Sequence, residues 1–440
     1  MKRTTRFLVG FGCLVLVAVS WLVAVTAKSD AKRQEELIEK ATAHMQDEAY
    51  VRAVPLLEEA AEYEDKHTLE AETLLKQSYL KLSETSGYTR KYKDLLDKQM
   101  ARKDVQPDIF EEAARYYLDT SKASTAFEIL RNGIEKTGSE ELLTLYEDTR
   151  YAYKTGRSTY ADVGAIYQGT IQVKNDGGWG IATADGTLVI PCEYDKISTF
   201  SDGQAIAKKG SVISAIDADN NRVALCHDDK HVKDFSNYAN ERIGLKTDKG
   251  WVLANGNFQM VEMAVDEIAM FSGSYLPAKQ GEKWGMLSAG GTEWETEPKF
   301  DDIIRDELGR CSAQNAVFVK KGGQVILYVD GDQVGDTYED AKPFADGWAA
   351  VKKNGKWGYI DTEGTVKIEY QFDDALSFGQ HLAAVKQGRY WGYISVYGKI
   401  VISPDFLEAK SFSDGSAPVK TADGWRFITL LEYEKEVGIL

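Results

Sequence analysis

The stretch Asn354–Val366, NGKWGYIDTEGTV, places a tryptophan directly beside a glycine and then turns at Glu363-Gly364. Alternation of apolar and polar residues with a period of two, bounded by Asn-Gly and Glu-Gly, is the sequence signal of a β-hairpin. The same arrangement recurs at Trp179-Gly180, Trp284-Gly285 and Trp391-Gly392. The stretch therefore predicts a β unit that the chain uses repeatedly.

The spacing of these units indicates a continuous array. Tryptophans that begin the central strand stand at Trp179, Trp251, Trp284, Trp357, Trp391 and Trp425. The two long intervals contain Ile213–Asp217 and Ile326–Asp330, which align with Trp357–Asp361 but lack the indole. Each unit has a strand before the tryptophan and another after the following turn. We therefore expect a series of three-stranded antiparallel meanders.

The Trp-Gly pair has a physical explanation in such an array. A meander of three strands cannot bury both faces alone, so it must stack on a neighbour. An indole between sheets buries roughly 150–250 Å², an upper bound on the order of 4–6 kcal/mol at about 25 cal/mol per Å². The glycine would remove the Cβ where the adjacent sheet comes closest. The alternative is that the tryptophans line a sugar site.

The ends of the array predict a closed ring. Thr170–Lys174 matches the first strand of a unit, and Gly424–Ile428 matches the second. A blade shared between the two ends would remove the free sheet edges. We expect a seven-bladed β-propeller over residues 168–440, with an open, capped β-solenoid as the rival.

This region resembles the WG-repeat family, bacterial proteins built from repeats of about this length. The resemblance rests on the Trp-Gly pairs, on Ile360-Asp361, and on a recurring Phe-Ser-Asp-Gly motif. That motif occupies Phe200–Gly203 and Phe412–Gly415, with Phe344–Gly347 as a variant.

Residues 28–167 have a helical pattern in which apolar residues recur every three or four positions. Small residues with matching separations occur at Ala41, Ala53 and Ala60 and again at Ala114, Ala126 and Gly133. Such residues are needed where paired helices touch. The segment resembles the tetratricopeptide repeat, and Asp47–Ala53 is similar to its turn and second helix. That resemblance implies a protein- or peptide-binding solenoid; a generic helical bundle or a spacer is the alternative.

The N-terminal residues 1–27 contain an uncharged apolar run, residues 7–27, preceded by Lys2, Arg3 and Arg6. At 1.5 Å rise per residue this run can cross roughly 30 Å of hydrocarbon. It exceeds the usual core of a signal peptide, so we expect a signal-anchor rather than a cleaved leader. The predicted fold class is thus α + β multidomain: a transmembrane helix, a tetratricopeptide-like solenoid and an all-β propeller. Residues beyond 27 would lie outside the cytoplasm.

Composition limits the partners. The 440 residues carry a formal net charge of −16, which repels phosphate backbones and argues against nucleic acid. A cationic or neutral ligand would fit this charge better. Cys192, Cys226 and Cys311 are expected to be single buried thiols.

The sequence predicts no catalytic, cofactor-binding or metal-binding residue. The chain lacks the common nucleophile, phosphate-loop and zinc motifs. Cys226–His231 groups several ligand types, but a polar loop is the better interpretation. Asp185, Asp361 and Glu363 are expected to serve turns rather than calcium.

These observations predict a membrane-anchored, extracytoplasmic bacterial scaffold or binding protein. It would not be an enzyme, and would recognise protein or cell-envelope ligands through its repeat surfaces. The alternative is a carbohydrate- or peptidoglycan-binding propeller, or a hydrolase with carboxylates in the central channel. Exposed aromatic residues on one propeller face would favour a sugar ligand.

Overall fold

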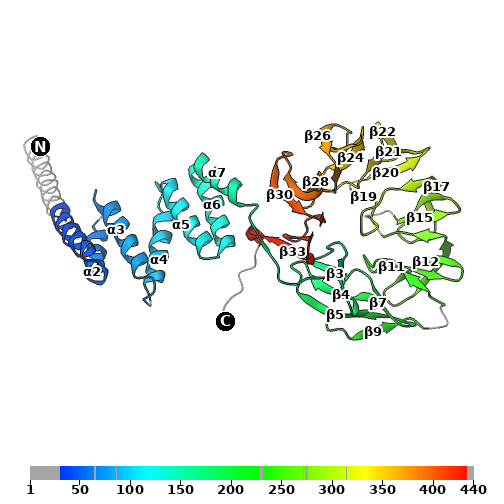
Figure 1. Ribbon diagram of the computed structural model, residues 1–440, viewed down its shortest axis with the longest axis horizontal. Coiled ribbons are helices and arrows are strands. Elements are labelled where there is room, and N and C mark those ends of the chain that lie inside the picture. The colour runs from blue at the N-terminus through cyan, green and yellow to red at the C-terminus, as the bar shows by residue number, and fades with distance from the viewer. Residues whose placement is uncertain are drawn as a thin grey trace, which may run out of the picture. The chain divides into compact units, whose positions relative to one another are not determined.

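The computed structural model describes residues 30–63, 66–85, 87–227, 231–270, 272, 276–313 and 315–433. The chain divides into two compact units, one ending at Tyr146 and the other beginning at Glu147 (Figure 1). Among the helices in this described part, none has the length and hydropathy needed to span a membrane. The predicted anchor, residues 7–27, lies outside the described residues.

The first unit is a succession of helices. One helix occupies residues 30–46. The others are α2 (Tyr50–Ala61), α3 (Thr68–Lys81), α4 (Tyr88–Met100), α5 (Pro107–Asp119), α6 (Ala123–Thr137) and α7 (Glu140–Thr149). From α2 to α6, each helix packs against the next. The predicted helical region is therefore confirmed as far as Thr149, with α2 starting at Tyr50 after the expected turn. The rest of it, expected to be helical to residue 167, contains the short strands Tyr153–Thr155 and Asp162–Val163 instead.

The small residues of this unit lie at helix contacts, as the sequence predicted. The predicted alanines are all fully buried: Ala41, Ala53, Ala60, Ala114 and Ala126. A Cβ at Gly133 of α6 would lie 2.7 Å from Cγ of Phe110 in α5. These contacts explain why the positions cannot hold larger side chains. A tetratricopeptide-like arrangement finds only loose support in this succession of helices.

The second unit is a β-propeller whose sheets form a ring (Figure 1). Its blades are numbered in chain order. Blade 1 is β2 (Asp162–Val163), β3 (Thr170–Asn175), β4 (Gly178–Thr183) and β5 (Leu188–Tyr194); blade 2 is β6 (Lys196–Ile197), β7 (Ala205–Lys209), β8 (Val212–Ile216) and β9 (Arg222–Leu225); blade 3 is β10 (Asp234–Phe235), β11 (Arg242–Thr247), β12 (Gly250–Asn255) and β13 (Met260–Val265); blade 4 is β14 (Glu267–Ile268), β15 (Leu276–Gln280), β16 (Lys283–Leu287) and β17 (Trp294–Phe300).

The remaining blades follow the same antiparallel order. Blade 5 is β18 (Asp302–Ile303), β20 (Ala316–Lys321), β21 (Gln324–Val329) and β22 (Asp332–Tyr338), with β19 (Ser312–Ala313) paired to β20; blade 6 is β23 (Asp340–Ala341), β24 (Ala349–Lys353), β25 (Lys356–Ile360) and β26 (Val366–Phe372); blade 7 is β27 (Asp374–Ala375), β28 (Leu382–Gln387), β29 (Tyr390–Ser395) and β30 (Ile400–Phe406); blade 8 is β31 (Glu408–Ala409), β32 (Ser416–Thr421), β33 (Gly424–Leu430) and β1 (Tyr153–Thr155). A 3₁₀ turn, Leu431–Tyr433, follows β33.

The propeller has eight blades, so the predicted number of seven is wrong. Thr170–Asn175 does not complete the last blade, because it belongs to a full blade of its own. The strand that completes blade 8 is β1, whose Tyr153 pairs with Leu430 of β33. Closure by a blade shared between the two ends is therefore confirmed. The expected start of the β region at residue 168 falls between β2 and β3.

Each blade also has one strand more than the predicted meander. The additional strand has two residues and comes first in the unit, as β23 does before β24. We call it the inner strand. It pairs with only two residues of its neighbour, Asp340 with Lys352 and Ala341 with Val351 in blade 6. Such a short strand carries no detectable alternation, which is why the sequence did not predict it.

The indoles lie between neighbouring blades, as predicted. Trp357 of blade 6 is 3% exposed and belongs to a core cluster with Phe378 and Val385 of blade 7. Trp425 of blade 8 packs with Val173 of blade 1 and so closes the ring. The indole therefore stabilises the contact from one blade to the next.

The glycine after the tryptophan has a different role from the one expected. A Cβ on Gly358 would lie 2.6 Å from the carbonyl oxygen of Ile368, and one on Gly392 would lie 2.5 Å from that of Ile402. Both carbonyls belong to the last strand of the same blade, at an irregularity in the strand register. The glycine therefore admits a close approach within the blade, not from the adjacent sheet.

Candidate functional site

One position divides the eight blades into two groups, the residue that follows the inner strand. Its backbone N–H donates to the second strand in every blade, as Lys342 does to the carbonyl of Ala350. The residues at this position are Gly164, Ser198, Ser236, Ala269, Ile304, Lys342, Leu376 and Lys410 in blades 1 to 8. It is therefore small in blades 1–4 and large in blades 5–8.

Large residues at this position cover the indole of their own blade. The ammonium of Lys342 lies 5.4 Å from the ring centre of Trp357, and that of Lys410 lies 5.4 Å from that of Trp425. Leu376 packs in the cluster that contains Trp391. A cation over the face of an indole adds electrostatic attraction to the shielding from water.

Blades 1 and 3 lack this cover. Gly164 and Ser236 occupy the position there. Lysines of the second strand, Lys174 and Lys246, lie 5.5 and 5.9 Å from the ring centres of Trp179 and Trp251, but both indoles remain partly exposed. In blade 4, where Ala269 is also small, the guanidinium of Arg305 takes the place of the cover, 3.9 Å from the ring centre of Trp284. Among the described residues, only two of the indoles that begin a central strand are thus accessible, and both lie in the first half of the ring.

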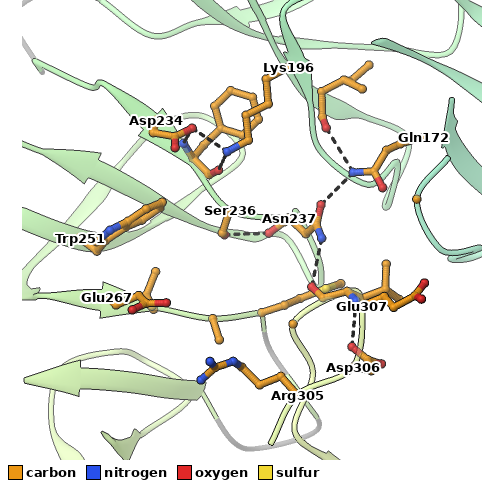
Figure 2. Close-up of a pocket in the computed structure, with 18 of the residues that line it drawn as sticks. Gln172, Lys196, Asp234, Ser236, Asn237, Trp251, Glu267, Arg305, Asp306 and Glu307 are labelled. Atoms are coloured by element: carbon orange, nitrogen blue, oxygen red, sulfur yellow. Dashed lines mark hydrogen bonds and ion pairs between the residues drawn. The ribbon is translucent and has the colours of Figure 1, made fainter. Parts of the chain in front are cut away.

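The accessible indoles line one cavity of about 750 Å³, which we call the indole pocket. Blades 1 to 4 and a loop of blade 5 contribute to it (Figure 2). Its charged lining residues are Asp195, Lys196, Asp234, Glu267, Arg305, Asp306 and Glu307. Aromatic faces together with a few convergent polar groups are typical of a ligand site.

Lys196 is fixed at the rim of the pocket by blade 3. Its ammonium donates to Asp234 Oδ1 at 2.6 Å and to the carbonyl of Phe235 at 2.7 Å. Burial would raise the pKa of Asp234, but the hydrogen bond from Lys196 opposes it, and the net pKa is lowered. Asp234 is therefore ionised at neutral pH and suited to accepting hydrogen bonds, not to protonating a leaving group.

The floor of the pocket is held by amide side chains. Gln172 Nε2 donates to Asn237 Oδ1 at 2.9 Å, and Asn237 Nδ2 donates to the carbonyl of Leu308 at 3.0 Å. These bonds connect blades 1, 3 and 5, as Figure 2 shows. Because both amide nitrogens are engaged, this side of the pocket is rigidly positioned.

Leu308 belongs to a loop that crosses the channel. Twelve residues, 304–315, separate β18 from β20, whereas six separate β2 from β3. Glu307 in this loop pairs with Lys410 of blade 8 at 2.8 Å. We call residues 304–313 the crossing loop.

The crossing loop stands between two cavities. Arg305 to Leu308 line the indole pocket and also a second cavity of about 670 Å³. The rest of the second cavity is made by loops that follow the inner strands, including Phe344–Asp346 and Phe378–Gln380. The turns around it are held blade to blade: Asp346 Oδ2 accepts the N–H of His381, and Asp414 Oδ2 accepts that of Gly169. The aspartates of the Phe-Ser-Asp-Gly motif are therefore structural.

The other residues considered in the sequence have structural positions. Asp361 Oδ1 accepts the N–H groups of Glu363 and Thr365 at 3.0 and 2.9 Å, which confirms its role in a turn. Asp185 accepts from Thr183 and Thr187 in the same way.

The three cysteines of the described residues form no disulfide. Cys226 and Cys311 are buried, as expected, while Cys192 is partly exposed. Burial raises the pKa of the Cys311 thiol to about 12. Within the described residues no group of three potential ligands could hold a metal ion. Residues 228–230 of the Cys226–His231 stretch lie outside them.

Sequence reasoning missed the indole pocket and the crossing loop. Two signals were available. The residue two places after the start of each inner strand changes from small to large midway along the array, and blade 5 carries the longer stretch Arg305–Asn315 where blades 2, 6 and 8 have a Phe-x-Asp-Gly turn. Neither signal can be read until the inner strands are aligned.

The second unit is thus an eight-bladed propeller in which the indoles of blades 1 and 3 are accessible and those of blades 4, 6, 7 and 8 are covered. The family model for the WG containing repeat matches residues 179–212, 337–357, 357–391 and 391–425. These matches show WG repeats at four places in the propeller, as the Trp-Gly pairs indicated.

Comparison with solved structures gives only distant likenesses. KlHsv2 with its loop 6CD replaced by a Gly-Ser linker has 9% identity and a TM-score of 0.36, and the match covers 62% of this chain and 96% of that one. The Pan2 WD40 domain of Neurospora crassa has 7% identity and a TM-score of 0.35, over 61% and 88%. No curated protein matches the chain.

Proposed function

We propose that this protein is a non-catalytic recognition protein that binds a carbohydrate-containing cell-envelope component in the indole pocket. The observation that carries this proposal is the selective exposure of Trp179 and Trp251. Indoles in the other blades are covered by Lys342, Leu376, Lys410 or Arg305, so exposure is not a general property of the repeat. Sugars stack their apolar faces on aromatic rings and donate hydroxyl protons to carboxylates.

The polar lining supports binding rather than hydrolysis. A glycosidase needs one carboxyl group that is protonated at working pH beside another that is ionised. Asp234 has a lowered pKa because of Lys196, and Glu307 is tied to Lys410 across the channel. Asp234 therefore serves as an acceptor for ligand hydroxyls, and Glu307 is not available as the second group of a catalytic pair.

The test is retention of the full chain on insoluble cell-envelope glycan. Trp251→Ala should reduce retention by about five- to a hundredfold, and Trp179→Ala should have a similar effect, since truncating a tryptophan that anchors a ligand costs on the order of 1–3 kcal/mol. Tyr397→Ala is the matched control, because Tyr397 is 86% exposed on blade 7, outside the pocket. Equal retention of all variants would contradict the proposal.

A scaffold role in which the helical unit binds a protein partner is the second candidate. It is supported by the succession of packed helices from α2 to α6. A deletion that tests it must stop at residue 146, because β1 at Tyr153–Thr155 completes blade 8. Partners captured equally by the full chain and by a chain lacking residues 34–146 would exclude this role.

Membrane attachment through residues 7–27, with the remainder outside the cytoplasm, completes the proposal. It is supported by the apolar run and its preceding positive charges. Alkaline extraction of membranes should leave the full chain in the pellet. Release of the chain, or protection of its C-terminal part from external protease in spheroplasts, would contradict it.

A further inference from the structure

Blade 2 breaks a charge pattern that the other seven blades share. The first residue of each inner strand faces a lysine of the second strand. The acidic residues in these pairs are Asp162, Asp234, Glu267, Asp302, Asp340, Asp374 and Glu408, facing Lys174, Lys246, Lys279, Lys320, Lys352, Lys386 and Lys420. In blade 2, Lys196 faces Lys208.

Two lysines directly opposite one another destabilise a sheet, whereas an acid and a lysine stabilise it. Lys196 recovers an acidic partner only by reaching Asp234 of blade 3. Lys208 has no carboxylate opposite it, and its ammonium donates to the carbonyl of Lys233 at 3.0 Å. A local arrangement that costs stability in one repeat among eight points to a functional constraint.

Lys196 and Lys208 both line a further depression in the surface. It is lined by Asp195, Lys196, Lys208, Gly210, Lys233, Asp234 and Lys246, which we call the lysine depression. Four ammonium groups face two carboxylates there, in a chain of net charge −16. Each carboxylate already accepts a hydrogen bond, Asp195 from the N–H of Gly210 and Asp234 from Lys196. The summed charge of these side chains stays positive even when Asp248, which pairs with Lys233 at 2.6 Å, is included.

The lysine depression adjoins the indole pocket, because Asp195, Lys196 and Asp234 line both. Lys246 of the depression is the cross-strand partner of Trp251 in the pocket. Its ammonium lies 5.9 Å from the centre of the indole. A ring stacked on Trp251 would therefore carry its substituents toward the lysines.

We propose that the indole pocket and the lysine depression form one binding site for an acidic saccharide. The sugar ring lies against Trp251, its hydroxyls reach Asp234 and Glu267, and its carboxylate or phosphate substituent lies among Lys208, Lys233 and Lys246. This inference rests on the proposed function and specifies its ligand class. It also replaces the expectation of a cationic or neutral ligand, which considered only the net charge of the whole chain.

The test measures tryptophan fluorescence of the full-length protein during titration with glucose, glucuronic acid and glucose 6-phosphate. At low ionic strength, at least one acidic sugar should bind about tenfold more tightly than glucose, and the tighter one identifies the substituent. Raising the salt to about 0.5 M should reduce this preference, because the screening length falls to a few ångströms.

The lysines are tested by Lys208→Gln, alone and with Lys246→Gln. Both variants should lose the preference for the acidic sugar, measured as the ratio of its affinity to that of glucose in the same variant. Lys399→Gln, at a surface lysine of blade 7, is the control and should keep it. The single variant removes only one hydrogen bond to a backbone carbonyl, so it keeps the test valid if the double variant fails to fold.

The outcomes separate the two proposals. Equal affinity for all three sugars, lowered by Trp251→Ala, would overturn the acidic-saccharide inference and leave the proposed function standing. A preference for acidic sugars that survives both lysine variants would also overturn the inference. If none of the three sugars binds, the acidic-saccharide inference is wrong, and retention on cell-envelope glycan decides the proposed function separately.

Discussion

Blades 1–4 and blades 5–8 share the same four-stranded order, with β19 added in blade 5, and they differ systematically in the residue after the inner strand. Gly164 and Ser236 leave an indole accessible, whereas Lys342 and Lys410 cover one. The same tryptophan position can therefore have two roles, depending on this one neighbouring residue. Where the indole is covered it contributes to stability, and where it is uncovered it is available to a ligand.

The first prediction compares a covered with an uncovered indole. Trp357→Ala should lower the free energy of unfolding by about 3–5 kcal/mol, because it leaves a large cavity between blades 6 and 7. Trp251→Ala should cost markedly less, since that indole is partly exposed, while it removes sugar binding. Urea unfolding followed by circular dichroism measures both. Equal losses would show that the two halves do not differ in this respect.

The second prediction concerns a feature that both halves share. Gly180→Ala and Gly358→Ala should each destabilise by about 1–3 kcal/mol, because a Cβ would lie 2.4 or 2.6 Å from a carbonyl oxygen of the last strand. Gly290→Ala is the control, since the nearest atom to its Cβ would be Thr292 Oγ1 at 3.5 Å. Thermal unfolding separates them. A stable Gly358→Ala variant would contradict the close approach.

The third prediction exchanges the residue after the inner strand between the two halves of the ring. Ser236→Lys should cover Trp251, and Lys342→Ser should uncover Trp357. Quenching of fluorescence by acrylamide should fall in the first variant and rise in the second, with stability changes of about 1 kcal/mol from the hydrogen bonds lost. Ser236→Ala, which adds no cover, should leave the quenching unchanged. If Ser236→Lys still binds sugar, the pocket is not the site.

The smallest effect is a pH dependence that both halves should share. Burial of Asp361 raises its pKa, whereas the ion pair with Lys367 and the hydrogen bonds from two turn N–H groups lower it. The net pKa lies below the ordinary value of 3.8. Its contribution to stability is therefore present above about pH 4 and is lost as the pH falls through the lowered pKa. Asp361→Asn should flatten thermal stability slightly between about pH 5 and 2.5. An unchanged pH profile would contradict this role.

Sequence reasoning predicted the repeat well and the site poorly. Trp357 with Gly358 identified the central strand, and the turn at Glu363-Gly364 its end, because these are local features of backbone and side chain. The eighth blade was missed because β1 lies in a segment expected to be helical, and its pairing with β33 joins the two ends of the array. Lys208 carried no signal in isolation, since its meaning depends on Lys196 opposite it.

The sequence by itself determined the strand units, their turns and the burial of most indoles, because a period of two and the preferences of Gly and Asp act over a few residues. Only the tertiary structure decided the number of blades, the partner of each glycine and the place where two indoles stay open. Those properties depend on which distant residues the closed ring brings together, and the spacing of residues along the chain does not encode that.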